Sequence, residues 1–178
     1  MKTLTSDRAR FALTVVCAVI FAFTVALFQT SAAHRVFRTA PDLILAAAAA
    51  YAIRNRDSRA VFFALLCSFL ADASGSVGFS LMPLYHVAAA LVFSYIGSNA
   101  KNDRRFVAFW IFFPAAALSR SLLTLFSYAV KSSFSLDLYK LFVNVLFPEF
   151  IYTLIAAIPL YFAAMLFSLP SANERKEG

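Results

Sequence analysis

The feature that most constrains this sequence is a series of long apolar runs, separated by short segments that carry arginine and lysine. The first run, 11–28, has 18 residues and would form a helix about 27 Å long, close to the ~30 Å hydrocarbon thickness of a bilayer. Only 14% of the 178 residues are charged, against about a quarter in soluble domains, so charged groups cannot cover a globular surface. The sequence therefore predicts that lipid surrounds most of this chain.

The apolar runs predict an all-α membrane protein, a bundle of about six transmembrane helices. The spacing of the runs leaves no room for a separate soluble domain, so residues 1–178 are predicted to form a single polytopic membrane domain. The approximate spans are 11–30, 41–53, 60–72, 81–97, 106–130 and 141–169. A signal peptide is the alternative for the first span, because Ser31-Ala32-Ala33 resembles a cleavage site, but its apolar region is longer than a signal peptide needs.

The second span has unusual features. Its continuous apolar part, Leu43–Ile53, is only 11 residues long, so this helix and the next either cross a thin membrane region or form a short hairpin. Thr39 is a plausible N-cap, with Pro41 near the first turn. Five consecutive alanines, Ala46–Ala50, offer little to lipid but allow another helix to approach closely. This helix is therefore predicted to be central or at an interface.

The basic residues predict the orientation. With the N-terminus in the cytoplasm, the inner segments hold 11 lysines and arginines and the outer segments hold 4, while Arg120 lies inside a span. This asymmetry favours six spans with both termini cytoplasmic. The formal charge of +7 is thus read as a topology signal rather than as a nucleic-acid surface.

Two charged residues inside the apolar runs are predicted to meet. Arg120 lies about 15 Å along helix five from its outer end, and Glu149 about 12 Å from the outer start of helix six. A short connector between these helices would place both groups at similar depth, where pairing would relieve the cost of burying each charge. We expect an Arg120–Glu149 ion pair that acts as a structural clamp; a proton or ion relay is the alternative.

The remaining polar residues do not predict catalysis or metal binding. No second histidine, cysteine or acid stands at ligand spacing from His86. Asp42 and Asp72 are both expected near the outer surface, where a cap and a turn explain them as well as acid–base chemistry does. Ser119 and Ser121 have no base at helical spacing. The sequence predicts a protein that is not an enzyme and that has no metal or cofactor.

Several short motifs resemble those of MreD, the bacterial rod shape-determining membrane protein family. The resemblance runs from about Thr39 to Leu169 and includes the length and the basic inner loops. The motifs are Pro41-Asp42-Leu43, the run from Ala60 through Leu70-Ala71-Asp72, the turn Ser74-Gly75-x-x-Gly78-Phe79, and Pro148-Glu149 in the last helix.

The resemblance implies a non-catalytic scaffold of the cell-elongation complex in the bacterial cytoplasmic (inner) membrane. MreD-like proteins associate with MreC, and through it with MreB, RodA and a class B penicillin-binding transpeptidase that build peptidoglycan and maintain cell shape. The fold it implies is similar to the six-helix substrate-binding components of energy-coupling-factor transporters. A small-solute-binding component of such a transporter is therefore the alternative function, with the outer polar residues lining a pocket.

The partner surface expected for a scaffold follows from helix packing in membranes. Small residues such as Ala46 and Ala50, together with Ala88–Ala90, would form grooves for a partner's single transmembrane helix. The turn that contains Asp72, Gly75 and Gly78 would meet partner segments just outside the bilayer.

Overall fold

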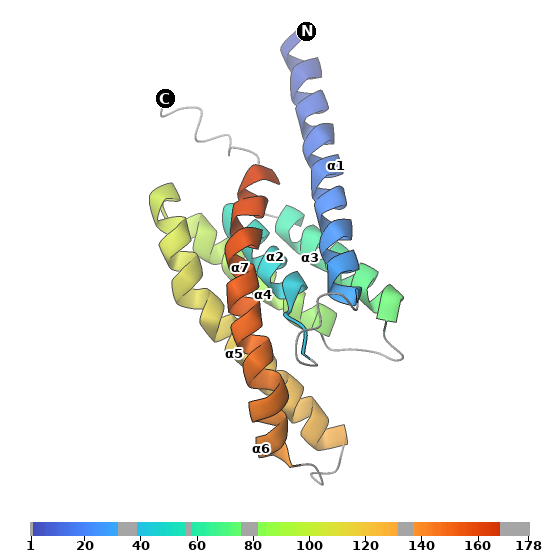
Figure 1. The fold of residues 1–178 in the computed structure, drawn as a ribbon. Coiled ribbons are helices and arrows are strands. Elements are labelled where there is room, and N and C mark those ends of the chain that lie inside the picture. Colours follow the sequence, from blue (N-terminus) through green and yellow to red (C-terminus); the bar gives the residue numbers. More distant parts are fainter. Residues whose placement is uncertain (1, 32–38, 56–57, 76–81, 132–136, 168–178) are drawn as a thin grey trace.

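The computed structural model describes residues 2–31, 39–55, 58–75, 82–131 and 137–167, and these residues are almost entirely helical, with no strand among them (Figure 1). Helices of 12 to 29 residues occupy all six predicted positions. They are α1 (Lys2–Thr30), α2 (Leu43–Arg54), α3 (Ser58–Gly75), α4 (Met82–Asn99), α5 (Arg105–Lys131) and α7 (Phe147–Phe167). A 3₁₀ turn, η2 (Asn102–Arg104), precedes α5, while α6 (Leu138–Leu141) and the π-helical turn η3 (Phe142–Leu146) lead into α7.

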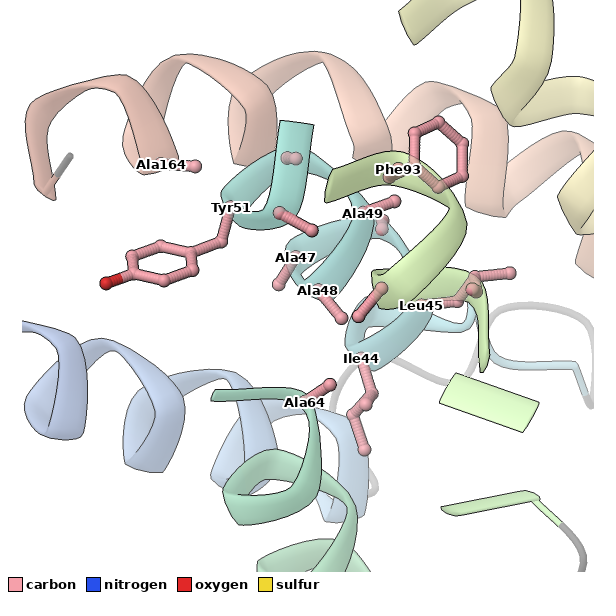
Figure 2. Close-up of a cluster of buried hydrophobic side chains, with 14 of the residues drawn as sticks. Ile44, Leu45, Ala47, Ala48, Ala49, Tyr51, Ala64, Phe93 and Ala164 are labelled. Carbon is pink, nitrogen blue, oxygen red and sulfur yellow. The ribbon is translucent and has the colours of Figure 1, made fainter. Parts of the chain in front are cut away.

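Helix α2 is the centre of the bundle. It contacts α1, α3, α4, α5 and α7, and all ten residues from Ile44 to Ile53 are at most 3% exposed. Figure 2 shows its side chains surrounded by residues of the neighbouring helices, among them Ala64, Phe93 and Ala164. A helix that is apolar on every side must be covered by other helices or by lipid, and here other helices cover it.

The enclosure of α2 settles one of the two roles expected for its alanines. With 12 residues it is about 18 Å long, too short to cross a bilayer by itself, but it does not need to reach lipid. Ala46 and Ala50 are fully buried against the chain's own helices, so the prediction of a central helix is confirmed. The expectation that Ala46 and Ala50 form a groove for a partner is wrong, because no partner can reach them.

Aromatic side chains fill the space on both sides of α2. Phe93 of α4 and Phe109 and Phe113 of α5 are fully buried, and the last two rings stack with centroids 4.8 Å apart. On the other side, the rings of Tyr51 and Phe63 stack at 4.4 Å between α2 and α3. The small side chains of α2 and the large rings around it thus form one continuous core.

At its C-terminal end α2 packs backbone against backbone on α4. A Cβ atom built on Gly97 would overlap the carbonyl of Ile53, so only glycine permits this approach. The contact places the end of α4 beside the end of α2, and η2 and the start of α5 follow at once. Arg54 and the basic segment Lys101–Arg105 therefore lie at the same end of the bundle, where α1 also begins and α7 ends in Figure 1.

The outer surface of the bundle is apolar. Large hydrophobic side chains on α1, α3, α4, α5 and α7 are exposed, with Leu166 at 82%, Tyr95 at 72% and Phe69 at 66%. Two segments, Asn102–Val130 and Tyr139–Leu166, are long and apolar enough to cross a membrane. Only 22% and 17% of their most apolar windows are buried, whereas the core helix of a soluble protein is mostly buried.

Candidate functional site

A buried polar network lies at the N-terminal end of α2, opposite the basic end of the bundle. We call it the Asp42 network, because every other member contacts Asp42 directly or through one intermediate. Its members come from five helical regions and are Asp42, Ser68, His86, Arg120, Glu149 and Thr153.

Asp42 is the N-cap of α2. Its carboxylate Oδ1 accepts a hydrogen bond from the N–H of Leu45 at 2.9 Å, and the residue is only 3% exposed. The cap expected at Thr39 is wrong; Thr39 is buried and precedes the helix by four residues. A carboxylate at this position also interacts favourably with the positive end of the helix dipole.

The first backbone N–H groups of a helix have no acceptor within the helix, and here side chains of two other helices accept hydrogen bonds from them. The N–H of Asp42 donates to Oγ1 of Thr153 at 2.8 Å, and the N–H of Leu43 donates to Oε1 of Gln29 at 2.7 Å. Residues of α1 and α7, far apart in sequence, thus complete the cap. These hydrogen bonds explain how the N-terminus of α2 can lie in the interior of the bundle.

Arg120 of α5 lies between two acids. Its Nε is 2.8 Å from Oδ2 of Asp42, and its Nη1 pairs with Oε1 of Glu149. The side chains are 15% exposed for Arg120, 4% for Asp42 and 14% for Glu149. The ion pair expected between Arg120 and Glu149 is present, but it is part of a larger network in which Asp42 is the more deeply buried partner.

Glu149 and Thr153 stand one turn apart at the start of α7. Oγ1 of Thr153 donates to the carbonyl of Glu149 at 2.8 Å while it accepts from the N–H of Asp42. The π-helical turn η3 immediately before them changes the register of the helix, since the N–H of Phe147 bonds to the carbonyl of Phe142, five residues back. Because Glu149 and Thr153 are one turn apart, they lie on the same face of α7. This face supplies a carboxylate to Arg120 and a hydroxyl acceptor to the N–H of Asp42.

His86 of α4 also contacts Asp42. Its Nε2 lies 3.2 Å from Oδ2 of Asp42, and its Nδ1 lies 2.9 Å from Oγ of Ser68 in α3. Both residues are buried, at 5% and 2% exposure. No partner for His86 could be predicted from the sequence, because Asp42 is 44 residues away and Ser68 is one of many serines in apolar surroundings.

A Ser–His–Asp chain of this kind invites comparison with a hydrolase triad. In a triad the serine faces Nε2 and the acid faces Nδ1, whereas here the two nitrogens are exchanged. Ser68 also lies in the middle of a helix and is 2% exposed, so a substrate carbonyl cannot reach its hydroxyl. The arrangement connects α2, α3 and α4 through side-chain contacts.

The other predicted site residues are placed less centrally. Pro41 is half-buried beside the cap. α3 continues as a helix to Gly75, so the part of the predicted turn from Asp72 to Gly75 is helical, and Gly78 lies outside the described residues. Within the described residues, no group of three or more histidine, cysteine, aspartate or glutamate side chains is placed to hold a metal ion.

Comparison of this chain with models of protein families, with curated proteins and with solved structures found no match.

Proposed function

We propose that this chain is a multi-pass protein of the bacterial cytoplasmic membrane that acts as a non-catalytic scaffold in the cell-elongation complex, with MreC as its direct partner. MreB, RodA and a class B penicillin-binding transpeptidase would be reached through MreC. The proposal combines the MreD-like motifs of the sequence with the properties of the bundle. Both termini would lie in the cytoplasm, as the distribution of basic residues favours.

The observation that carries the proposal is the way the interior is occupied. Alanine and phenylalanine side chains fill the described core around α2, and the charges of Asp42, Arg120 and Glu149 are paired with one another. A solute-binding component would instead direct polar groups such as Asp42, His86 and Arg120 toward a ligand. Mutual pairing supports a rigid clamp, and hence a scaffold, over the transporter alternative.

A partner helix would dock on the outside of the bundle, since Ala46 and Ala50 are enclosed. Among the described residues, Ala115 and Ser119 are exposed one turn apart on α5 and form a small-x-x-x-small pair of the kind that lets membrane helices approach closely. Ala88 of α4 is exposed as well, whereas Ala89 and Ala90 are buried. The outer face of α5 is therefore the surface on which we test the partner.

The test is co-purification of MreC with the tagged full chain from membranes solubilised in mild detergent. We expect MreC to be recovered with the wild type and recovery to fall several-fold with Ala115→Leu. Ala12→Leu is the matched control, since Ala12 is an exposed alanine of α1. Absence of MreC from the wild-type sample would overturn the proposed function, while equal recovery with both variants would reject only the α5 surface.

A further inference from the structure

The basic end of the bundle presents two cations at the start of α5. The segment Lys101–Arg105 holds three cations and one acid, Asp103. Arg105 is only 5% exposed and belongs to the interior, whereas Lys101 and Arg104 are exposed. Among the described residues, neither Lys101 nor Arg104 forms an ion pair with a carboxylate. Both charges are therefore available to an anion at the membrane surface.

Aromatic rings follow these cations along the line where α5 meets α7, and α5 begins and α7 ends at this end of the bundle (Figure 1). The ring centroid of Phe106 lies 5.3 Å from that of Tyr161 and 6.4 Å from that of Phe162. Trp110 packs edge-on against Phe106 at 6.3 Å. We call these four residues the α5–α7 seam. Phe106 and Phe162 are 45% and 53% exposed, Trp110 is half-buried and Tyr161 is buried, so the seam presents an apolar surface built from both helices.

The order of charge and rings along the chain matches the order of groups in a phospholipid. Phe106 follows Arg104 by two residues, about 3 Å along the helix axis, and Trp110 follows it by six residues, about 9 Å. In a bilayer the phosphates lie at the surface and the hydrocarbon begins directly below them. A phosphate beside Lys101 and Arg104 would therefore place its acyl chains at the depth of the rings. Arginine and lysine are also the side chains that bind phosphate most readily.

We propose that the α5–α7 seam binds one anionic phospholipid of the leaflet at the basic end of the bundle. Lys101 and Arg104 hold its phosphate, and its acyl chains lie on the exposed rings of Phe106 and Phe162. An anionic lipid is preferred to a zwitterionic one, because basic side chains at a membrane surface attract lipids with net negative charge.

The lipid site is separate from the surface on which we test MreC. Ala115 follows Phe106 by nine residues, about two and a half helical turns, and so lies on the other side of α5. The inference requires only that the bundle lies in a membrane, and it stands whether or not MreC is the partner.

The chain contains a single tryptophan, so the fluorescence of Trp110 reports on the seam. Lipids with brominated acyl chains quench a tryptophan that their chains contact. The full chain would be reconstituted in vesicles of phosphatidylcholine and phosphatidylglycerol, with bromine on one lipid or on the other in matched samples. We expect about a five-fold preference for phosphatidylglycerol at Trp110, the effect of roughly one basic residue near an anionic surface.

Neutralising the two cations should remove the preference and leave the contact with lipid. In the double variant Lys101→Gln with Arg104→Gln, the two brominated lipids should quench Trp110 equally. Arg59→Gln is the matched control, because Arg59 is exposed at the start of α3, and the described part of α3 contacts neither α5 nor α7. In micelles without anionic lipid the double variant should unfold like the parent, since both side chains are exposed. If the double variant does not fold, Arg104→Gln alone should lower the preference.

A preference that is lost in the double variant, or lowered in Arg104→Gln, and kept in Arg59→Gln would support the site. Equal quenching by the two lipids in the parent would overturn it, as would a preference that survives removal of the cations. An equal loss in Arg59→Gln would also overturn it, since the effect would then belong to the surface charge of the whole basic end. Inorganic phosphate added at constant ionic strength should leave the preference unchanged; if it abolished the preference, the cations would bind a soluble anion and not a lipid.

Discussion

The two ends of α2 are held by different physical means. At the C-terminal end, Gly97 lets α4 pack directly on the backbone at Ile53, so shape alone determines the contact. At the N-terminal end, hydrogen bonds and ion pairs of the Asp42 network hold α2, so direction and charge determine the contact. An added side-chain atom should therefore destabilise the packing at the C-terminal end of α2. Removal of a hydrogen-bond or ion-pair partner should instead destabilise the N-terminal end.

The largest effect is expected from Arg120→Leu. This change leaves Asp42 and Glu149 buried without their shared cation, which should lower the free energy of unfolding by about 3–5 kcal/mol. Denaturant unfolding of the full chain in mixed micelles would measure it. Arg104→Leu, at an exposed position in the basic segment, should change the value by less than about 0.5 kcal/mol.

Charge reversal sharpens the same comparison. If only Glu149 depended on Arg120, the double variant Arg120→Glu with Glu149→Arg would recover most of the stability lost in either single variant. Because Asp42 also contacts Arg120, the new glutamate would stand beside a second carboxylate, and recovery should be partial. Full recovery would show that Asp42 is not coupled to the pair.

A smaller effect is expected at the other end from Gly97→Ala. The added methyl group meets a backbone carbonyl, which cannot rotate away as a side chain can, so α4 must shift from α2 at a cost of about 1–3 kcal/mol. The same unfolding measurement applies, with Ser98→Ala at the exposed neighbouring position as control. A neutral Gly97→Ala would mean that this end of α2 is more loosely packed than we describe.

Among the single substitutions Arg120→Leu, Gly97→Ala and Thr153→Val, the smallest loss of stability is expected from Thr153→Val, which nearly preserves the volume of the side chain. It removes the acceptor of the Asp42 N–H and leaves a buried donor unsatisfied, at a cost of about 1–2 kcal/mol. Thr124→Val is a matched control, since that hydroxyl only donates to the carbonyl of Arg120 within its own helix. Equal losses in the two variants would indicate that the Thr153 contact to α2 contributes nothing.

The helices were predictable because each comes from a local pattern, an apolar run bounded by charged residues. The central place of α2 followed from its alanines, and the Arg120–Glu149 pair followed from counting residues along two helices joined by a short connector. His86 could not be assigned a partner, because its contacts depend on how α2, α3 and α4 cross. The partner groove expected at Ala46 and Ala50 was wrong, because small residues suit both a partner's helix and the chain's own core.

The position of Asp42 had a local signal that could have been used more fully. An aspartate directly before an apolar helical run is a strong N-cap candidate, better than a threonine three residues earlier. The local pattern does not reveal that the same carboxylate also faces Arg120 and His86, since those residues lie 78 and 44 positions away. The N-cap could therefore be predicted from the sequence, whereas the contacts of Asp42 with Arg120 and His86 could be seen only in the tertiary structure.

The enclosure of α2 has a consequence for how the protein is made. The ribosome produces α2 before α4, α5 and α7, which later cover most of it, and Thr153 belongs to α7, more than 100 residues after α2 begins. Until then this short alanine-rich segment has no acceptor from α7 for its first backbone amide and too little length to rest across a bilayer. The final position of α2 is therefore reached only after α7 has been made, so this part of the core forms later than the helices that enclose it.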